Sequence, residues 1–581
     1  MEVNPSFKSL RNLQLFLAGS TCLLIAIASG LSETAQGYEI SFYQDLTPVF
    51  WIALASGFLF FAGGLLDAST KSHGTNMAVH LVGLTVLNST LVTLPALKYG
   101  TYYTQWDVWF HLGQALSINR TGYVDLSVNV YPSLHLLWVA TAQLVGIPVY
   151  PLGQVFGAPL EAVRIPLVFV LATRLFNNKP AASLAAALSA IPDGIVGTYP
   201  SPWFYSLALL LALILVLVIR AEHPGTASSL ITLLLATSFV ISHPLGPLFL
   251  VTAFAILAVL MTIRKLSPSL KNRVSSGDPG ERGLLRLAVY LLVLYLAYIA
   301  LLTLVLQTSI TRLVEAFGTE GIVSPISFGR FFTLVLLAKV LGAYAVVGLY
   351  WIAGLLILRR MQVDRPRVGV RLTVWLTFSG LVIGVLFLSI ASPTLLSDFI
   401  QRPLDVLILL LPVFGGFFIE RLRHSFSHRS AKAFVTHGAL IIPFLVAAAA
   451  MYPSPYVALF NYQNTQQLYS SLDWVAVNAA SDATVLSNSY AGRYAYYPML
   501  AGDQRYLKLY HFRDTLPADL FQLEANSNGR TYLVLDKETI SVASLDLRAW
   551  RFPSAQDSEV IRMMLKATLV YDNGEVQVYV L

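Results

Sequence analysis

The sequence predicts a polytopic α-helical membrane protein with about 13 transmembrane helices and a small C-terminal extracytoplasmic α/β domain. Two observations predict the membrane class. Charged residues make up 12% of the 581 residues, about half the share in an ordinary soluble protein, and apolar residues make up 56%. The apolar residues also come in runs of roughly 18–22, the length that crosses the hydrocarbon core of a bilayer. This composition excludes a soluble enzyme.

The apolar runs define the candidate spans and their orientation. About fourteen runs are candidates: 13–32, 47–66, 77–97, 131–149, 159–176, 181–198, 203–219, 228–242, 245–263, 284–306, 331–358, 372–392, 404–419 and 434–451. The positive-inside rule places three strongly basic loops in the cytoplasm: 264–286, 359–371 and 421–432. The N-terminus, with Lys8 and Arg11, is expected there too, and everything after Met451 on the outer face. An odd number of spans is then needed, so about 13 are predicted, and 131–149 is the expected short or re-entrant segment.

The net charge of +7 resides in the membrane half, residues 1–451. No basic stripe is interleaved with exposed aromatic residues, so the charge predicts contact with membrane lipids and no nucleic-acid partner. Cys22 is the single cysteine, which excludes an internal disulfide and a thiolate metal site. The run at 13–32 lacks an obvious cleavage site and is predicted to be a retained first span.

Residues 452–581 have a different character and are predicted to form the α/β domain. The patterns predict strands at Thr484–Ser487, Arg505–Tyr510 and Tyr532–Asp536, an amphipathic helix from Tyr469 to Ala480, and short helices at Asp519–Ala525 and Glu559–Ala567. Alternating apolar residues flank Asn573-Gly574, which predicts a hairpin with a type I′ turn.

The outer loop 99–130 carries the most informative motif, Gln105-Trp106-Asp107-Val108-Trp109-Phe110-His111. Asp107 and His111 are four positions apart, so they share one face of a helix. An acid flanked by aromatic side chains at the mouth of a membrane bundle is partly desolvated, which raises its pKa and suits proton abstraction or metal binding. The alternative is that the two tryptophans belong to an interfacial belt and Asp107 caps the next helix.

This loop, its D-x-x-x-H motif, the following Tyr131-Pro132 and the C-terminal α/β domain ending in Tyr571–Tyr579 together resemble the GT-C superfamily of polytopic glycosyltransferases. That superfamily includes oligosaccharyltransferase catalytic subunits and protein O-mannosyltransferases. The resemblance implies an inverting transfer of a sugar from a polyprenyl phosphate or diphosphate donor to a protein, lipid or glycan acceptor. It implies that Asp107 is a general base, or a ligand of a divalent cation such as Mg or Mn.

Two departures separate the chain from the oligosaccharyltransferases. The turn at 197–205 lacks a paired-carboxylate metal motif, with Asp193 as the nearby acid, and the C-terminal domain lacks a W-W-D-Y-G signature. A monosaccharide transferase is therefore favoured over N-glycan transfer. Asp125 is the second carboxylate of the loop and, with Asp107, the other candidate metal ligand.

Six further residues are candidates for substrate binding, each with a structural alternative. His111, His135 and His243 are expected near the outer cavity or as hydrogen-bonded structural histidines. Arg164 and Arg402 are candidates for the lipid phosphate, although Arg164, near the outer end of its apolar run, is equally explained by snorkelling. Glu315 lies in a second outer loop, 307–330, that closes over the substrates or is merely solvated.

A transporter or flippase of a lipid-linked or amphiphilic substrate is the alternative function. Such a protein is expected to carry ionisable residues in mid-span or paired broken helices in two related halves. The sequence has few of the former and no convincing repeat, and its best polar motif lies in an outer loop. The enzyme is therefore favoured.

Overall fold

The fold is a helical bundle with a five-stranded sheet at one end, seen in a computed structural model. The structure describes residues 5–33, 39, 41–70, 74–100, 108–126, 129, 131–192, 201–223, 225–243, 246–253, 255, 279–302, 348–350, 352–354, 356, 393–449, 451–452, 466–479, 483–488, 508–512, 530–536, 568–574 and 576–580. The helices are α1 (Pro5–Gly30), η1 (Phe42–Asp45), α2 (Pro48–Thr70), α3 (Gly74–Tyr99), α4 (Val108–Thr121), α5 (Ser133–Val145), α6 (Val149–Ala162), α7 (Arg164–Phe176), α8 (Lys179–Ser189), α9 (Pro202–Glu222), α10 (Thr226–Val240), α13 (Pro279–Ala297), η2 (Tyr298–Leu302), α19 (Pro393–Ser425), α20 (Arg429–Ala448) and α21 (Gln466–Asn478).

Six segments among the described residues are long and apolar enough to cross a membrane: Leu10–Gly30, Pro48–Thr70, Asn76–Tyr99, Val149–Phe176, Pro202–Arg220 and Arg429–Ala448. Large apolar side chains are exposed on α1, among them Leu13, Leu17 and Leu24, as expected of a helix that faces lipid. The predicted multi-pass helical architecture is thus confirmed. The predicted total of about 13 spans stays a prediction, because several of the predicted spans lie among residues outside the described part.

The run predicted at 131–149 contains only the short helix α5. Pro132 precedes it, and Gly146, with φ of 74°, ends it. With 13 residues, α5 is about 20 Å long, too short for the hydrocarbon core. The next run, predicted at 159–176, begins earlier, because α6 and α7 together form one candidate span over Val149–Phe176.

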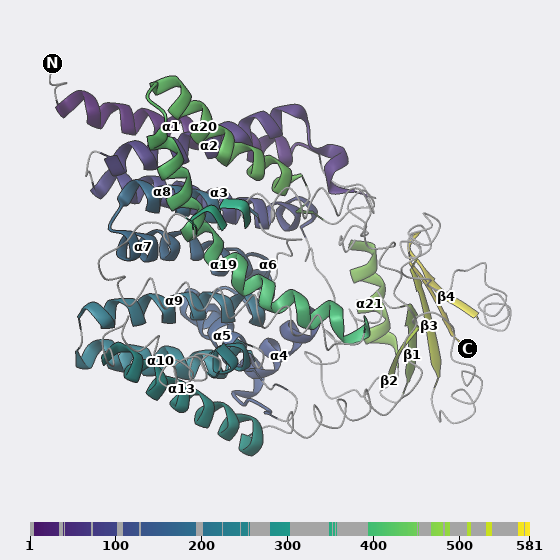
Figure 1. Ribbon diagram of the computed structural model, residues 1–581. Coiled ribbons are helices and arrows are strands. Elements are labelled where there is room, and N and C mark those ends of the chain that lie inside the picture. The colour runs from purple at the N-terminus through teal and green to yellow at the C-terminus, as the bar shows by residue number, and fades with distance from the viewer. Residues whose placement is uncertain are drawn as a thin grey trace.

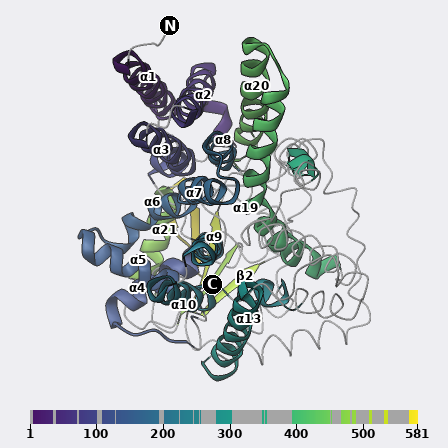
Figure 2. The same cartoon turned by 60° about the vertical axis from the view of Figure 1, so that its left-hand side comes forward.

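Two groups of helices make up the bundle. One buried core joins α1, α2, α3, α8 and α20, and a second joins α7, α9, α10, α13 and α19. Figure 2 shows α1, α2 and α3 nearly end-on and α20 lengthwise, with the strands behind the helices. The groups meet where α19 crosses α8. There Gly416 lies so close that a Cβ at this position would be 2.4 Å from the backbone nitrogen of Ala185.

The sheet has the order β2-β1-β3-β5-β4. Its strands are β1 (Thr484–Asn488), β2 (Lys508–Phe512), β3 (Thr531–Asp536), β4 (Thr568–Asp572) and β5 (Val576–Val580). β1 is parallel to β2 and β3, and β5 is antiparallel to β3 and β4. The strands predicted at Thr484–Ser487 and Tyr532–Asp536 and the hairpin are present, and the strand predicted at Arg505–Tyr510 is described at Lys508–Phe512. The hairpin turn, however, is not type I′. Gly574 has a positive φ and Asn573 does not, because the Asn573 Oδ1 accepts a hydrogen bond from the Val576 amide at 2.9 Å.

The sheet and the first long loop share one core. Leu112 and Ala115 of α4 and Trp138 of α5 are buried together with Val475 of α21 and Val576 of β5. Figure 1 shows α4 and α5 at the end of the bundle where α21 and the strands lie. The loop helices and the C-terminal strands therefore lie at the same end of the bundle. Their placement on the outer face of the membrane stays a prediction. The domain boundary at 451/452 itself stays a prediction.

Two polar clusters hold that end of the bundle together. The Lys98 ammonium, at the end of α3, is buried and forms ion pairs with Glu39, at 3.0 Å, and with Asp45 of η1. Burial raises the pKa of Glu39, although Lys98 and Tyr99 oppose that shift. After α20, the Tyr452 hydroxyl donates to the Leu91 carbonyl of α3 at 2.6 Å.

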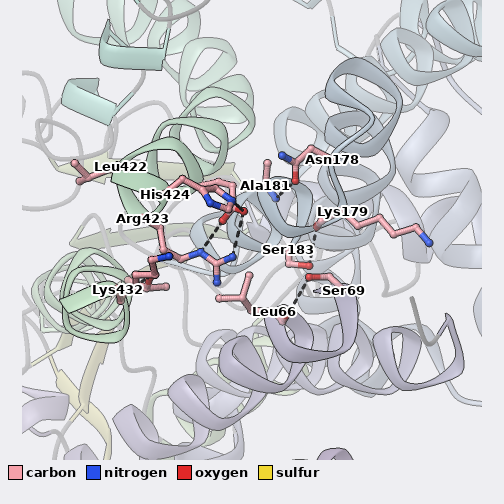
Figure 3. Close-up of polar contacts among 12 residues, drawn as sticks. Leu66, Ser69, Asn178, Lys179, Ala181, Ser183, Leu422, Arg423, His424 and Lys432 are labelled. Atoms are coloured by element: carbon pink, nitrogen blue, oxygen red, sulfur yellow. Dashed lines mark hydrogen bonds and ion pairs between the residues drawn. The ribbon is translucent and has the colours of Figure 1, made fainter. Parts of the chain in front are cut away.

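A third cluster closes α19 at the opposite end of the bundle. Glu420 is buried, and its carboxylate binds Arg423 at 2.9 Å and His424 at 2.9 Å within the same helix. Figure 3 shows Arg423 and His424 beside the start of α8, where the Asn178 side chain accepts from the Ala181 amide as the helix N-cap. Arg423 and His424 of the same helix thus provide ion-pair partners for the Glu420 carboxylate. These partners offset the cost of burying the acid next to α8.

Candidate functional site

The candidate site is built by α4, α5 and the turn that joins them. α4 begins at Val108, the residue after Asp107, and ends where Gly122 adopts a φ of 68° and its amide bonds to the Ile118 carbonyl at 2.8 Å. The chain then turns through Asn129, whose backbone N–H donates a hydrogen bond to the backbone carbonyl of Asp125 at 2.7 Å. This compact return brings one face of α5 against α4.

His111 of α4 and His135 of α5 form a buried hydrogen-bonded pair. The His111 Nδ1 lies 3.0 Å from the His135 Nε2, and the His135 Nδ1 lies 3.1 Å from the Asn129 Oδ1. The exposed fractions of the three residues are 4%, 0% and 1%. The structure therefore brings together two of the histidines that the sequence singled out and adds Asn129, which it did not.

Both histidines are held in the neutral form. Burial lowers the pKa of His135 to about 3. Burial also lowers the pKa of His111 well below its ordinary value of 6.5, and the neighbouring His135 and His243 lower it further. A neutral imidazole can both donate and accept a hydrogen bond, which is the chemistry that suits contact with hydroxyl groups.

His243 reaches the same site from the end of α10. Its ring centroid lies 5.5 Å from that of Tyr131, which in turn lies 5.9 Å from that of His111. On its other side, His243 makes an edge contact with Trp203 of α9 at 5.0 Å. The Trp203 indole donates to Asp405 of α19 at 2.8 Å. An aromatic and polar chain thus links the loop to three bundle helices.

The remaining candidates are distributed differently. Arg164 begins α7, in the interior of the span Val149–Phe176 and not near its outer end, because α6 extends the span toward its N-terminus. Its Nη2 donates to the Ile191 carbonyl after α8 at 3.2 Å, and Glu161 lies 3.6 Å away. The hydrogen bond from Arg164 satisfies the Ile191 carbonyl just after the C-terminal end of α8, where a positive charge is favourable.

Asp125 is exposed in the turn after α4, and Arg402 belongs to α19, three positions before Asp405. Asp107 and Glu315 lie outside the described residues, as do the predicted short helices at Asp519–Ala525 and Glu559–Ala567. Within the described part of the chain, no group of three His, Cys, Asp or Glu side chains fits a metal ion. The described residues thus do not make a divalent-cation site by themselves, and the predicted site at Asp107 and Asp125 stays a prediction.

Three residues of this site were missed by the sequence patterns: Asn129, Trp203 and Asp405. Asn129 carries a local signal, since it is a polar residue between two valines just before Tyr131-Pro132. The bond between Trp203 and Asp405 joins positions far apart in the chain, so no local pattern contains it.

No family model and no curated protein sequence matches the chain. Solved structures do match it. The Archaeoglobus fulgidus oligosaccharyltransferase, in a crystal structure with Zn and sulfate, has a TM-score of 0.50 and 13% identity over 86% of this chain and 72% of that chain. ArnT from Cupriavidus metallidurans, bound to undecaprenyl phosphate, has a TM-score of 0.45 and 12% identity over 87% of this chain and 98% of that chain. The first likeness shows that the two chains share a fold.

Proposed function

We propose that this chain, which has the GT-C fold, is a membrane glycosyltransferase. It transfers a sugar from a polyprenyl phosphate or diphosphate donor to a protein, lipid or glycan acceptor on the extracytoplasmic face. The N-terminus lies in the cytoplasm, and residues 452–581 form the extracytoplasmic domain.

The observation that carries the proposal is the placement of the buried histidine pair. His111 and His135 lie in the loop helices that directly follow Asp107, at the end of the bundle that also carries the C-terminal strands. Polar groups of this kind gathered at the mouth of an apolar bundle suit a substrate that has a polar head and a lipid tail. A GT-C fold with such a site supports a lipid-linked sugar as donor.

In the proposed reaction, Asp107 accepts the proton of an acceptor hydroxyl or amide. The acceptor atom attacks the anomeric carbon, the bond from that carbon to the phosphate oxygen breaks, and the lipid phosphate leaves with the electron pair. Attack opposite the leaving group inverts the anomeric centre. His111 and His243 contact the sugar or acceptor, and His135, predicted from the sequence to bind substrate, instead holds His111 in place through the 3.0 Å hydrogen bond. Arg402 and Arg164 are the proposed partners of the phosphate. Glu315 and Asp125 belong to the loops that enclose the substrates.

The test is sugar transfer in nanodiscs. The wild type, Asp107→Asn and the matched control Glu33→Gln, an exposed acid outside the site, receive a panel of polyprenyl-phosphate sugars. Mass spectrometry follows the released lipid phosphate and the glycosylated acceptor. We expect turnover by the wild type and the control, and a loss of about 100-fold or more in Asp107→Asn at an unchanged melting temperature.

Two other results are informative. Equal turnover by wild type and Asp107→Asn would remove Asp107 from the mechanism and leave the enzyme class intact. Movement of an intact lipid-linked sugar across the membrane, with no sugar consumed from the whole panel, would replace the glycosyltransferase with the flippase.

A further inference from the structure

The short helix α5 is apolar on the side that it exposes as well as on the side that it buries. Its buried side packs against α4 and α6 in the core shared with the C-terminal strands. The opposite side, here called the exposed side of α5, repeats at helical spacing and consists of Leu136, Leu137, Ala140 and Leu144. Leu144 is 87% exposed. A helix that is apolar all round fits an apolar environment on both sides.

The exposed side of α5 continues along the chain into a membrane span. α5 ends at Val145, and the candidate span Val149–Phe176 begins four positions later, a distance of at most about 14 Å. Residues 146–148 between them are exposed, and the span itself exposes Val155 and Val170, as a lipid-facing helix does. The C-terminal end of α5 therefore lies close to the edge of the hydrocarbon core.

The sequence around α5 lacks the charge that a surface in water carries. Asp125 is the single acidic or basic residue between Arg120 and Glu161, and it precedes the helix. An exposed surface that is both apolar and uncharged marks contact with a membrane or another apolar partner.

Polar and aromatic groups lie at the border of this surface. Gln143 of α5 donates to the Asn119 side chain of α4 at 3.3 Å. Tyr123, which follows α4, is 68% exposed. Tyrosine is enriched at the level of the lipid headgroups, where its ring contacts apolar groups and its hydroxyl contacts water. These groups favour a lipid surface as the partner, since they provide a headgroup level beside the apolar side.

We propose that α5 is a membrane-interface helix, whose exposed side is inserted among the lipids of the leaflet next to the C-terminal strands and contacts their acyl chains. α5 does not cross the membrane, because 13 residues are too few. His135 lies on the buried side of α5, so the lipid contact fixes the His111–His135 pair at the level of the headgroups. The proposal rests on α5 and the span that follows it, and not on the proposed glycosyltransferase function.

Spin-label accessibility in nanodiscs of phosphatidylcholine and phosphatidylglycerol tests this placement. Cys22 is the single cysteine, so Cys22→Ala gives a full-length background for one nitroxide label at a time. The test labels are Leu137→Cys and Leu144→Cys. The lipid and water references are Leu24→Cys of α1 and Thr568→Cys of β4, both exposed positions. Oxygen concentrates among the acyl chains, whereas a nickel chelate stays in water.

The two test labels should behave like a shallow lipid position. We expect oxygen access close to that of the Leu24 label and nickel access about fivefold or more below that of the Thr568 label, at a depth of about 5–10 Å. Nickel access equal to that of the Thr568 label would overturn the proposal, because α5 would then lie in water. Protection from both reagents would overturn it too, because protein would then cover the helix.

A charge substitution tests the same contact without a label. Leu144→Asp places a carboxylate among the acyl chains and should lower the melting temperature in nanodiscs by about 2–4 °C. Val477→Asp is the matched control, since Val477 is an apolar residue of α21 with 77% exposure, and it should melt like the wild type. Equal melting of Leu144→Asp and Val477→Asp would contradict the lipid contact. If Leu144→Asp fails to fold, the spin labels still decide.

Discussion

The indole Nε1 of Trp203 donates a hydrogen bond to the Asp405 Oδ2 at 2.8 Å, and this bond ties the start of α9 to α19. Trp203 is buried and also touches His243, so the bond holds one wall of the candidate site in place.

Removing the acceptor of this bond should destabilise the protein. Asp405→Ala leaves the buried Trp203 N–H without this partner, at a cost of about 1–3 kcal/mol, whereas Asp405→Asn keeps an oxygen and should cost less. Thermal unfolding in detergent measures the difference. Equal melting temperatures for Asp405→Ala and the wild type would show that the bond contributes nothing to stability.

The neutral histidines predict a dependence of stability on pH. An unfolded histidine titrates near pH 6.5, whereas His111 and His135 stay neutral in the folded protein to much lower pH. Below pH 6.5 the unfolded state therefore binds protons that the folded state does not. The stabilisation is complete above pH 6.5 and falls as the pH decreases toward 3, by at most about 1.4 kcal/mol per pH unit for each histidine.

Melting temperatures at pH 7.5, 6 and 5 test this dependence. We expect a decline in the wild type that is shallower in the variant carrying His111→Gln and His135→Gln. His428→Gln, an exposed histidine at the start of α20, is the control and should follow the wild type. Parallel curves for all three proteins would contradict the prediction.

Lys98 should be essential to its ion-pair cluster. Lys98→Met leaves Glu39 and Asp45 facing each other without a cation, and removing one partner of a buried ion pair costs about 3–5 kcal/mol. Adding Glu39→Gln and Asp45→Asn removes both charges, so thermal stability should recover in the triple variant. A triple variant as unstable as Lys98→Met would locate the defect in lost packing of the lysine stem.

Two helical glycines should respond oppositely to alanine. At Gly416 a methyl group would meet the backbone of Ala181 and Ala185 within 2.4–2.5 Å, so Gly416→Ala should push α19 from α8 and cost about 1–3 kcal/mol. At Gly438 of α20 nothing lies within 4 Å, and Gly438→Ala should stabilise the helix by about 0.5–1 kcal/mol. Thermal unfolding of the two variants side by side decides, and a stable Gly416→Ala would contradict the tight crossing.

The sequence predicted what depends on local patterns. Apolar runs located most of the described bundle helices, and alternation located β1, β3 and the hairpin of β4 and β5. The sequence predicted the ends of helices and the type of turn less well where a single residue determines them. Gly146 in a left-handed conformation splits the apolar stretch into α5 and α6, and the Asn573 side chain changes the type of the hairpin turn.

The site was predictable in part for the same reason. His111 was found by its spacing from Asp107, and His135 and His243 as polar residues at the ends of apolar runs. The structure places His111 and His243 against Tyr131 and pairs His135 with His111. Their pairing depends on how α4 returns against α5, and the contact of Trp203 with Asp405 depends on the packing of α9 against α19. Such contacts come from tertiary structure, which no spacing in the sequence encodes.

The core that α4, α5 and α6 share with the C-terminal strands has a consequence in time. Val576 of β5 completes that core 424 positions after Leu152 of α6 has left the ribosome. At roughly 5–20 residues per second, the interval is about 20–85 s. During that interval Leu112, Trp138 and Leu152 lack the cover that β5 provides in the folded protein. The core beside the candidate site is therefore completed only once β5 has been synthesised.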